Sequence, residues 1–196
     1  MYNIKKEVKK KIDQYSNKEY LDGYIKSEYL TADGDADIFL NINNIEEFYD
    51  EKTLANQLDL NSEVYEYIDS KTEMLDNSVK INLQVVSPEL SSNESQKIKH
   101  LISEHYAIEL YKVQREYKKY NSKIVKLLAL GFIFFVCYLL INMDQTSTLF
   151  SEVFGFLFSF LLWEAFDTII YTLSEIKAER ESVTQKLLME ITFRNK

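Results

Sequence analysis

The sequence predicts an α+β protein in which a small mixed domain stands on a two-helix transmembrane hairpin. Two long apolar segments, 127–143 and 149–173, are each close to the roughly 20 residues that a helix needs to cross a bilayer. Shorter segments with helical or alternating patterns lie before and after them. We therefore expect a cytosolic α+β domain with a helical stalk over 1–120, a hairpin over 121–173, and a C-terminal helix with a returning strand over 174–196.

The segments outside the apolar pair carry the periodicities of both helices and strands. Ile4, Val8 and Ile12 recur at helical spacing, and Asn61 stands where an N-cap begins a helix. Alternating apolar residues that end before Pro88 indicate a strand. The predicted helices cover 3–15, 60–74, 93–107 and 174–187, and the predicted strands cover 38–42, 79–86 and 189–193.

The two apolar segments are joined by the short polar link NMDQTST, which predicts a hairpin. From Ile108 the helical pattern continues without a break into the first segment. A buried hairpin of a soluble protein is the alternative, but Phe-Phe, Leu-Leu and Ile-Ile pairs leave no polar stripe on these helices. Lysine and arginine flank both segments and are absent from the link. The positive-inside rule therefore places both termini in the cytoplasm, in a multi-pass protein of the cell membrane.

The net charge of -8 hides three blocks of unequal sign. Residues 1–18 hold six lysines and two acids, 19–76 hold 16 acids and three lysines, and 97–126 hold eight basic residues and three acids. The acidic block would repel a phosphate backbone, so we expect no duplex nucleic acid as a partner. The basic block at 97–126 leads into the first apolar segment, which suits the anionic surface of a lipid bilayer.

An acidic turn, DGDAD, comes nearest to a metal site. Asp33, Asp35 and Asp37 open like a calcium-binding loop. That loop requires glycine and glutamate at the positions where this sequence has Ile38 and Asn44. We therefore expect a solvated turn and no metal.

Other residues with reactive side chains lack the patterns that catalysis requires. His100 and His105 are five residues apart, which does not place them on one helical face as an i, i+4 pair would. Cys137 is the single cysteine, so one chain forms no disulfide. The sequence has four glycines and no Walker loop, dinucleotide fingerprint or nucleophile elbow. We expect neither an enzyme nor a cofactor.

Two acidic residues, Glu164 and Asp167, interrupt the second apolar segment in the stretch LLWEAFDTII. Folding the hairpin about its link places Glu164 level with Lys126, and Asp167 level with Lys123. These four residues then lie in the cytoplasmic part of the bilayer, where a charge costs less than at its centre. An interfacial ion pair between Lys126 and Glu164 is one expectation.

Small residues recur on the same segment, with Ser151, Gly155 and Ser159 at intervals of four, a spacing that lets two helices approach closely. Gly131 lies level with Ser159, which predicts a close crossing there. At about 100° per residue, Glu164 points away from this small face. In one arrangement the small face contacts the first span, and Glu164 meets another subunit, a pore or lipid headgroups. In the other, the small face contacts another subunit, and Glu164 pairs within the hairpin. Both arrangements imply a homo-oligomer.

Three stretches resemble an uncharacterised family of two-span membrane proteins from low-GC bacteria. They are LNSEVYEYIDSKTEMLDNSVKINLQVV, ESQKIKHLISEHYAIEL and, after an apolar span, WEAFD. The likeness covers roughly residues 37–190, and it implies a membrane hairpin without implying an activity. The architecture is more loosely similar to membrane effectors of bacterial antiphage systems, which answer nucleotide signals by perturbing the membrane. Such an anionic signal would have to use the basic residues at 1–18 or 97–119.

Two functional hypotheses follow from these observations. In the first, the cytosolic domain binds or senses a partner protein or a small anionic signal. The continuous helix through 108–143 then passes the change to an oligomeric hairpin that conducts ions or perturbs the membrane. In the alternative, the protein is a non-conducting scaffold tethered to the membrane. Its acidic surface at 19–76 would recruit a basic partner protein.

Overall fold

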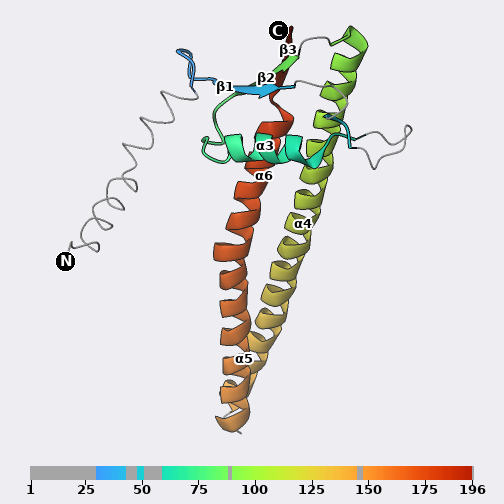
Figure 1. Ribbon diagram of the computed structural model, residues 1–196. Coiled ribbons are helices and arrows are strands. Elements are labelled where there is room, and N and C mark those ends of the chain that lie inside the picture. The colour runs from blue at the N-terminus through green and yellow to red at the C-terminus, as the bar shows by residue number, and fades with distance from the viewer. Residues whose placement is uncertain (1–29, 43–47, 51–58, 88–89, 145–147, 196) are drawn as a thin grey trace, which may run out of the picture. The chain divides into compact units, whose positions relative to one another are not determined.

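The computed structural model describes residues 30–42, 48–50, 59–87, 90–144 and 148–195. The chain divides into two compact units. The sheet unit comprises Met1–Tyr106 and Thr184–Lys196, and the hairpin unit comprises Ala107–Val183. The elements, labelled in Figure 1, are β1 (Ala36–Asn41), α3 (Ser62–Thr72), β2 (Ile81–Ser87), α4 (Ser92–Asp144), α5 (Thr148–Asp167), the π-helical turn η2 (Thr168–Thr172), α6 (Leu173–Leu187) and β3 (Glu190–Asn195).

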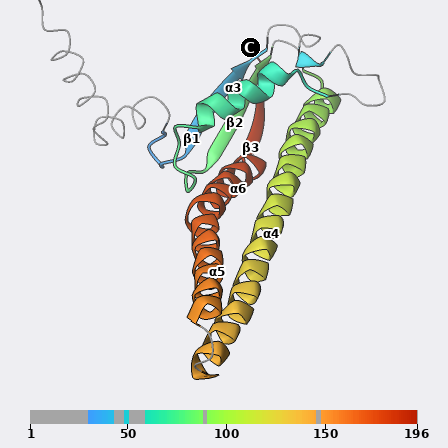
Figure 2. The same cartoon turned by 90° about the horizontal axis from the view of Figure 1, so that it is seen from below.

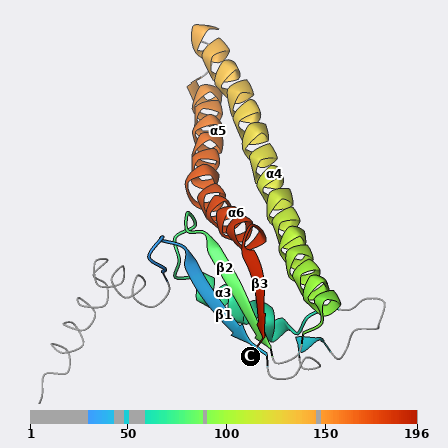
Figure 3. The ribbon, with the colours of Figure 1, turned by 90° about the horizontal axis from the view of Figure 1, so that it is seen from above.

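The sheet unit contains a parallel three-stranded sheet in the order β1-β2-β3. The register sets Ile38 beside Leu83, and Leu83 beside Ile191, so one row of apolar side chains crosses all three strands. Figures 2 and 3 view the sheet from opposite sides and show α3 lying across one face of it. On that face, α3 and the first turns of α4 bury Ile68, Ile98 and other apolar residues against the strands.

The order β1-β2-β3 explains why the helices gather on one face. A crossover between parallel strands is almost always right-handed. When successive crossovers move in the same direction across the sheet, they therefore lie on the same side of it. The opposite face of the sheet carries mostly polar residues. Phe39, Thr192 and Arg194 are exposed there, and Asn82 and Gln84 lie between them on the central strand.

The prediction of a mixed helix-and-strand protein is confirmed. Each strand overlaps its predicted range, and the last strand returns to the sheet as expected. The Asn61 side chain accepts a hydrogen bond from the Glu63 backbone N–H at 3.2 Å, as an N-cap does. The predicted helix over 3–15 lies outside the described residues.

Helix α4 is continuous over 53 residues, so the predicted run from the sheet unit into the first apolar segment is confirmed. Its start is fixed by a capping box. The Ser91 backbone N–H and hydroxyl both donate to the Glu94 carboxylate, at 2.9 and 2.6 Å, and the Glu94 backbone N–H donates back to the Ser91 hydroxyl at 3.2 Å. Because these bonds favour the charged form, they lower the pKa of Glu94.

In the hairpin unit, α4 packs against α5 and α6 along a seam with the 3.5-residue period of a coiled coil. Buried and half-buried residues of α4 recur at alternating intervals of four and three residues. The residues of this seam are Val113, Tyr117, Tyr120, Ile124, Leu127, Gly131, Phe134, Tyr138 and Ile141, and the neighbouring Phe135 and Cys137 are half-buried as well. The facing seam on α5 and η2 is formed by Ser151, Phe154, Phe158, Leu161, Ala165 and Thr168. The side chains at the remaining positions of both apolar segments are largely exposed.

Candidate functional site: the polar residues of the hairpin

An ion pair joins the two helices of the hairpin unit. Lys123 Nζ on α4 donates a hydrogen bond to Glu164 Oε1 on α5 over 2.7 Å. Glu164 therefore pairs with Lys123, where the sequence led us to expect Lys126. Asp167, expected level with Lys123, acts on that lysine through its charge but forms no ion pair with it among the described residues. Both partners are partly exposed, at 45% and 39% of the side-chain area, so solvent moderates the attraction.

The seam explains this choice of partners. In a heptad lettered a to g with the seam at a and d, Lys123 and Glu164 both fall at g, directly beside the seam. Lys126 and Asp167 both fall at c, on the outer side of their helices. Charged residues at e and g are the ones that form salt bridges between coiled helices. The level of Glu164 along the helix pair was predicted to within one turn, but the angular position of the lysines around α4 was not.

The same seam revises the expectation for the small residues. The Ser151 hydroxyl donates to Asn142 Oδ1 at 2.8 Å, and Gly155 faces the ring of Tyr138. A Cβ at Gly155 would lie 3.3 Å from two carbons of that ring, so α4 approaches closely here. Ser159 instead turns outward and donates to its own helix, at the Gly155 carbonyl. The small face therefore leaves the interface after Gly155.

Gly131 is buried at the seam, as the predicted close crossing requires, but its neighbours differ from the expected Ser159. A Cβ added there would meet Phe158 at 3.8 Å and Leu161 at 3.6 Å. Because α5 contacts α4 through both Gly155 and Glu164, the two alternatives drawn from the sequence are not exclusive. The coiling of the pair brings each residue to α4 in turn. An oligomer no longer follows from these faces alone.

A π-helical turn interrupts the second leg of the hairpin just beyond Asp167. The Leu173 backbone N–H donates to the Thr168 carbonyl, five residues back, where an α-helix would join residues four apart. The seam shows the effect directly, because the buried Thr168 and the buried Leu173 are separated by five residues. The turn thus inserts one residue into the heptad and moves the seam onto Leu173, Ile176, Arg180 and Val183.

Hydroxyl groups donate to one carbonyl before this turn and to two carbonyls within it. Thr168 Oγ1 donates to the Glu164 carbonyl at 2.8 Å, and Ser174 Oγ donates to the carbonyls of Ile170 and Tyr171 at 2.5 and 2.8 Å. The π turn therefore lies within one turn of the residue that binds Lys123. Single π turns inside α-helices are frequent at functional sites. Nothing in the periodicity of LLWEAFDTII predicted it.

The exposure of the two apolar helices differs from that of a core helix in a soluble protein. Their most apolar 18-residue windows have mean hydropathies of 2.7 and 1.7, and 11% of each window is buried. A soluble core helix would be mostly buried. Phe132, Phe156 and Trp163 are among the large apolar side chains that point away from the seam. Both helices are long and apolar enough to cross a membrane.

A polar network in the sheet unit ties three helices together. Asp69 Oδ1 on α3 accepts hydrogen bonds from Lys186 Nζ on α6 at 2.6 Å and from the Tyr106 hydroxyl on α4 at 3.2 Å. The Lys186 ammonium also lies 5.6 Å from the centre of the Tyr106 ring. Beside it, Gln185 Nε2 donates to the carbonyls of Asp76 and Val79 at 2.9 and 2.7 Å. Sequence reasoning missed this network.

The exposed face of the sheet contains amide oxygens without hydrogen-bond donors. Asn82 Nδ2 donates to Asp37 Oδ1 at 3.2 Å, but Asn82 Oδ1 is buried with no partner in the described part of the chain. The same is true of Gln84 Oε1, on a residue that is 6% exposed. An unsatisfied buried acceptor is costly, and because both oxygens are inaccessible to solvent, a donor would reach them only after these side chains move.

The two histidines considered in the sequence analysis contact neighbouring side chains of the sheet unit. His105 stacks on the Tyr65 ring with 3.6 Å between centroids, and His100 Nε2 lies 3.7 Å from Glu104. Burial and the hydrogen bond to Asp59 raise the pKa of Tyr65. Among the described residues, no three histidine, cysteine or acidic side chains are grouped so as to hold a metal ion.

No known protein family, curated protein or solved structure matches the chain. The resemblance to two-span proteins of low-GC bacteria therefore stays an expectation.

Proposed function

We propose that this chain is an integral membrane protein whose sheet unit binds a ligand or partner and transmits the event to an oligomeric hairpin. The observation that carries the proposal is the insertion of α4, α5, η2 and α6 between two neighbouring strands, β2 and β3. The first leg of the hairpin therefore starts after β2, and the second leg ends before β3 of the same small sheet. A change at the sheet reaches both legs through the backbone.

The Asp69 network supports this coupling. Tyr106 belongs to the first leg and Lys186 follows the second, and both bind the same carboxylate of α3. Ligand binding on the exposed face, next to Asn82 and Gln84, would act on strands whose other face packs against α3. A structural switch requires an element with two discrete arrangements. We propose that α3, α4 and α6, joined by the polar contacts of Asp69, form such an element.

The Lys123–Glu164 pair and the adjoining π turn are where the hairpin itself would respond. A polar pair inside an otherwise apolar helix pair is costly in lipid and marks a functional position by default. A single two-helix hairpin encloses no pore, so conduction requires several copies side by side. The ion pair remains accessible at about 40% exposure to a neighbouring copy, to water or to lipid headgroups.

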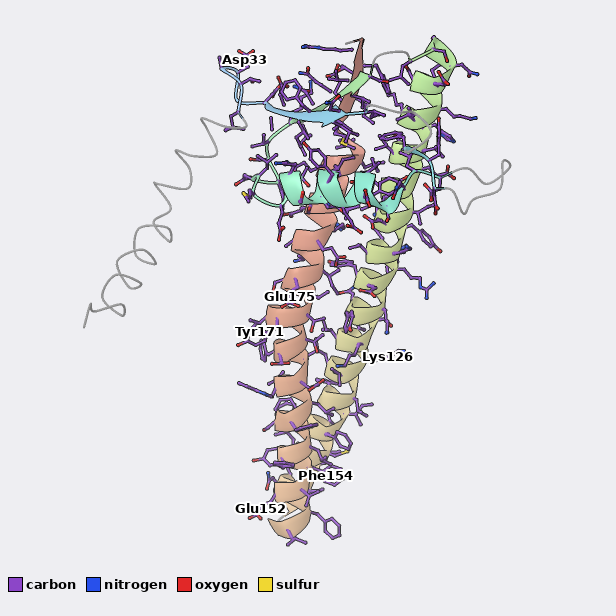
Figure 4. The ribbon with its side chains drawn as sticks, in the orientation of Figure 1. Asp33, Lys126, Glu152, Phe154, Tyr171 and Glu175 are labelled. Atoms are coloured by element: carbon purple, nitrogen blue, oxygen red, sulfur yellow. The ribbon has the colours of Figure 1, made fainter. Side chains whose placement is uncertain are left out.

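Ion flux from liposomes containing the purified full-length protein tests the proposal. We expect flux from the wild type, and a change in its rate for Glu164→Ala and for Asp167→Ala. Glu175→Ala is the matched control, because Glu175 is an exposed acid of α6 beyond the π turn (Figure 4). A monomeric mass in detergent together with no flux under any condition would contradict the proposal.

A non-conducting scaffold is the second candidate, and the exposed acids of the sheet unit favour it. Asp33, Glu63, Glu66 and Glu73 are all exposed to solvent. These carboxylates would attract a basic partner protein. Replacing the hairpin by an unrelated pair of membrane helices distinguishes the two functions. A scaffold keeps its partner and its biological effect after the exchange, whereas a coupled hairpin loses its effect.

A further inference from the structure

A groove of about 360 Å³ lies on one flank of α4, in the hairpin unit, where the basic sequence meets the apolar segment. Figure 4 labels Lys126, which belongs to it. All the lining residues fall at heptad positions c, g and d, which are neighbours around a helix. The lining residues are Lys119, Tyr120, Lys123, Lys126, Leu127 and Leu130.

The lining changes character along the helix axis. The lysines at 119, 123 and 126 come first, and Leu127 and Leu130 follow, at the start of the exposed apolar surface. A glycerophospholipid has the same order, with a charged headgroup followed by an acyl chain. Basic pockets at the cytoplasmic ends of membrane helices are suited to anionic headgroups.

The groove keeps an excess of positive charge, because only one of its three lysines is paired with a carboxylate in the part of the chain that the structure describes. Glu164 is hydrogen-bonded to Lys123, and Asp167 also acts on that lysine. Within the described residues, neither Lys119 nor Lys126 forms an ion pair. Lys119 instead lies 5.6 Å from the centre of the Tyr120 ring. The ammonium groups of Lys119 and Lys126 therefore remain available for an anionic ligand, on either side of Lys123, which is paired with Glu164.

We propose that this groove binds the headgroup of an anionic phospholipid, with Lys119 and Lys126 contacting the phosphate and Leu127 and Leu130 contacting the first part of an acyl chain. The inference rests on the proposed function, because it requires the apolar helices to lie in a membrane. It adds a lipid ligand beside Glu164. Binding there draws Lys123 toward the phosphate and competes with its bond to Glu164, which links lipid composition to the state of the hairpin.

Trp163 provides the measurement, because it is the single tryptophan, adjoins Glu164 and is 72% exposed. The full-length protein is reconstituted in phosphatidylcholine that contains a minor fraction of either brominated phosphatidylglycerol or brominated phosphatidylcholine. Bromine in the acyl chain quenches indole fluorescence at short range. We expect stronger quenching by brominated phosphatidylglycerol at equal mole fraction, and the ratio gives the relative affinity for the anionic lipid.

Lys119→Gln and Lys126→Gln remove the two available charges and leave the Lys123–Glu164 pair in place. Each substitution is expected to lower the relative affinity by about fivefold, the factor for one lysine near an anionic surface. Lys126→Arg restores the affinity, and Lys112→Gln, an exposed lysine of the same helix outside the groove, is the matched control with no effect.

The outcomes separate this inference from the proposed function. Equal quenching by the two brominated lipids overturns the lipid site while leaving a membrane hairpin intact. No quenching by either lipid overturns both. Loss of the preference in inorganic phosphate, but not in sodium chloride of the same ionic strength, shows that the groove takes free phosphate and overturns the assignment to a lipid.

Discussion

Lys186 on α6 donates a 2.6 Å hydrogen bond to Asp69 on α3, although 117 residues separate them in the chain. The Lys186 side chain is 11% exposed, whereas that of Asp69 is 42% exposed. The bond therefore places a nearly buried ammonium group against a carboxylate at the surface.

Replacing Asp69 should destabilise the sheet unit more than replacing an exposed acid of the same helix. Asp69→Ala leaves the Lys186 ammonium buried without its carboxylate, and we expect a loss of about 1–2 kcal/mol in the free energy of unfolding. Denaturant unfolding of the full-length protein in detergent measures it. Lys186→Met should be milder, and in the double variant the two losses should not add. Glu66→Gln is the control, and an equal loss there would contradict the assignment.

Exchange of charges between Lys123 and Glu164 should preserve the hairpin. Lys123→Glu alone places two carboxylates together and lowers the thermal midpoint, whereas adding Glu164→Lys restores it. We expect an effect near 1 kcal/mol for the single variant, because the pair is partly exposed. Lys126→Glu is the control with little effect on the midpoint. If Lys126→Glu, and not Lys123→Glu, were rescued by Glu164→Lys, the pairing seen in the structure would be wrong.

Deleting Ile170 should convert the π turn into regular α-helix. The residue is exposed, and its removal sets Thr168 and Leu173 four residues apart, so the heptad seam becomes continuous. We expect the thermal midpoint to be retained and the flux from liposomes to change. Ile170→Ala truncates the same exposed side chain, keeps the extra residue of the π turn and is the control. A large loss of helicity for the Ile170 deletion would show that the turn is needed for folding.

The capping box of α4 should give a stabilisation that depends on pH. The hydrogen bonds from Ser91 lower the pKa of Glu94 below its ordinary 4.5. Because the folded-state pKa is the lower one, the stabilisation is fully present above pH 4.5 and is lost as the pH falls through the folded-state value. Glu94→Gln should therefore lower the unfolding midpoint at neutral pH, with a difference from the wild type that shrinks below pH 4.5. Ser91→Ala should cost about 1 kcal/mol at neutral pH.

Local pattern was sufficient for the elements and their order. Alternation located β2 and β3, the turn DGDAD preceded the strand found as β1, and the helical spacing beyond Ile108 predicted that α4 would continue without a break. These features depend on residues a few positions apart. Asn61 was recognised as a cap for the same reason, because its bond partner Glu63 is two residues away.

The sequence was insufficient where the outcome depends on how two helices coil. Folding the hairpin about its link gave the residue of α4 that lies level with Glu164 to within a turn, but it does not give the side on which Lys123 or Lys126 faces. A straight-helix projection placed Ser159 at the interface, whereas the 3.5-residue seam takes Phe158 and Leu161 there instead. The π turn, with its extra residue, adds a rotation that no periodicity in the sequence announces.

The order in which the strands occur along the chain has a consequence for biosynthesis. A ribosome completes both long apolar helices before it makes β3, so β2 keeps a bare edge throughout that interval. The sheet closes only after Glu190–Asn195 emerge. Chains that stall before that point carry a central strand that is paired with β1 on one edge and bare on the other, and quality-control proteases would meet them in that form.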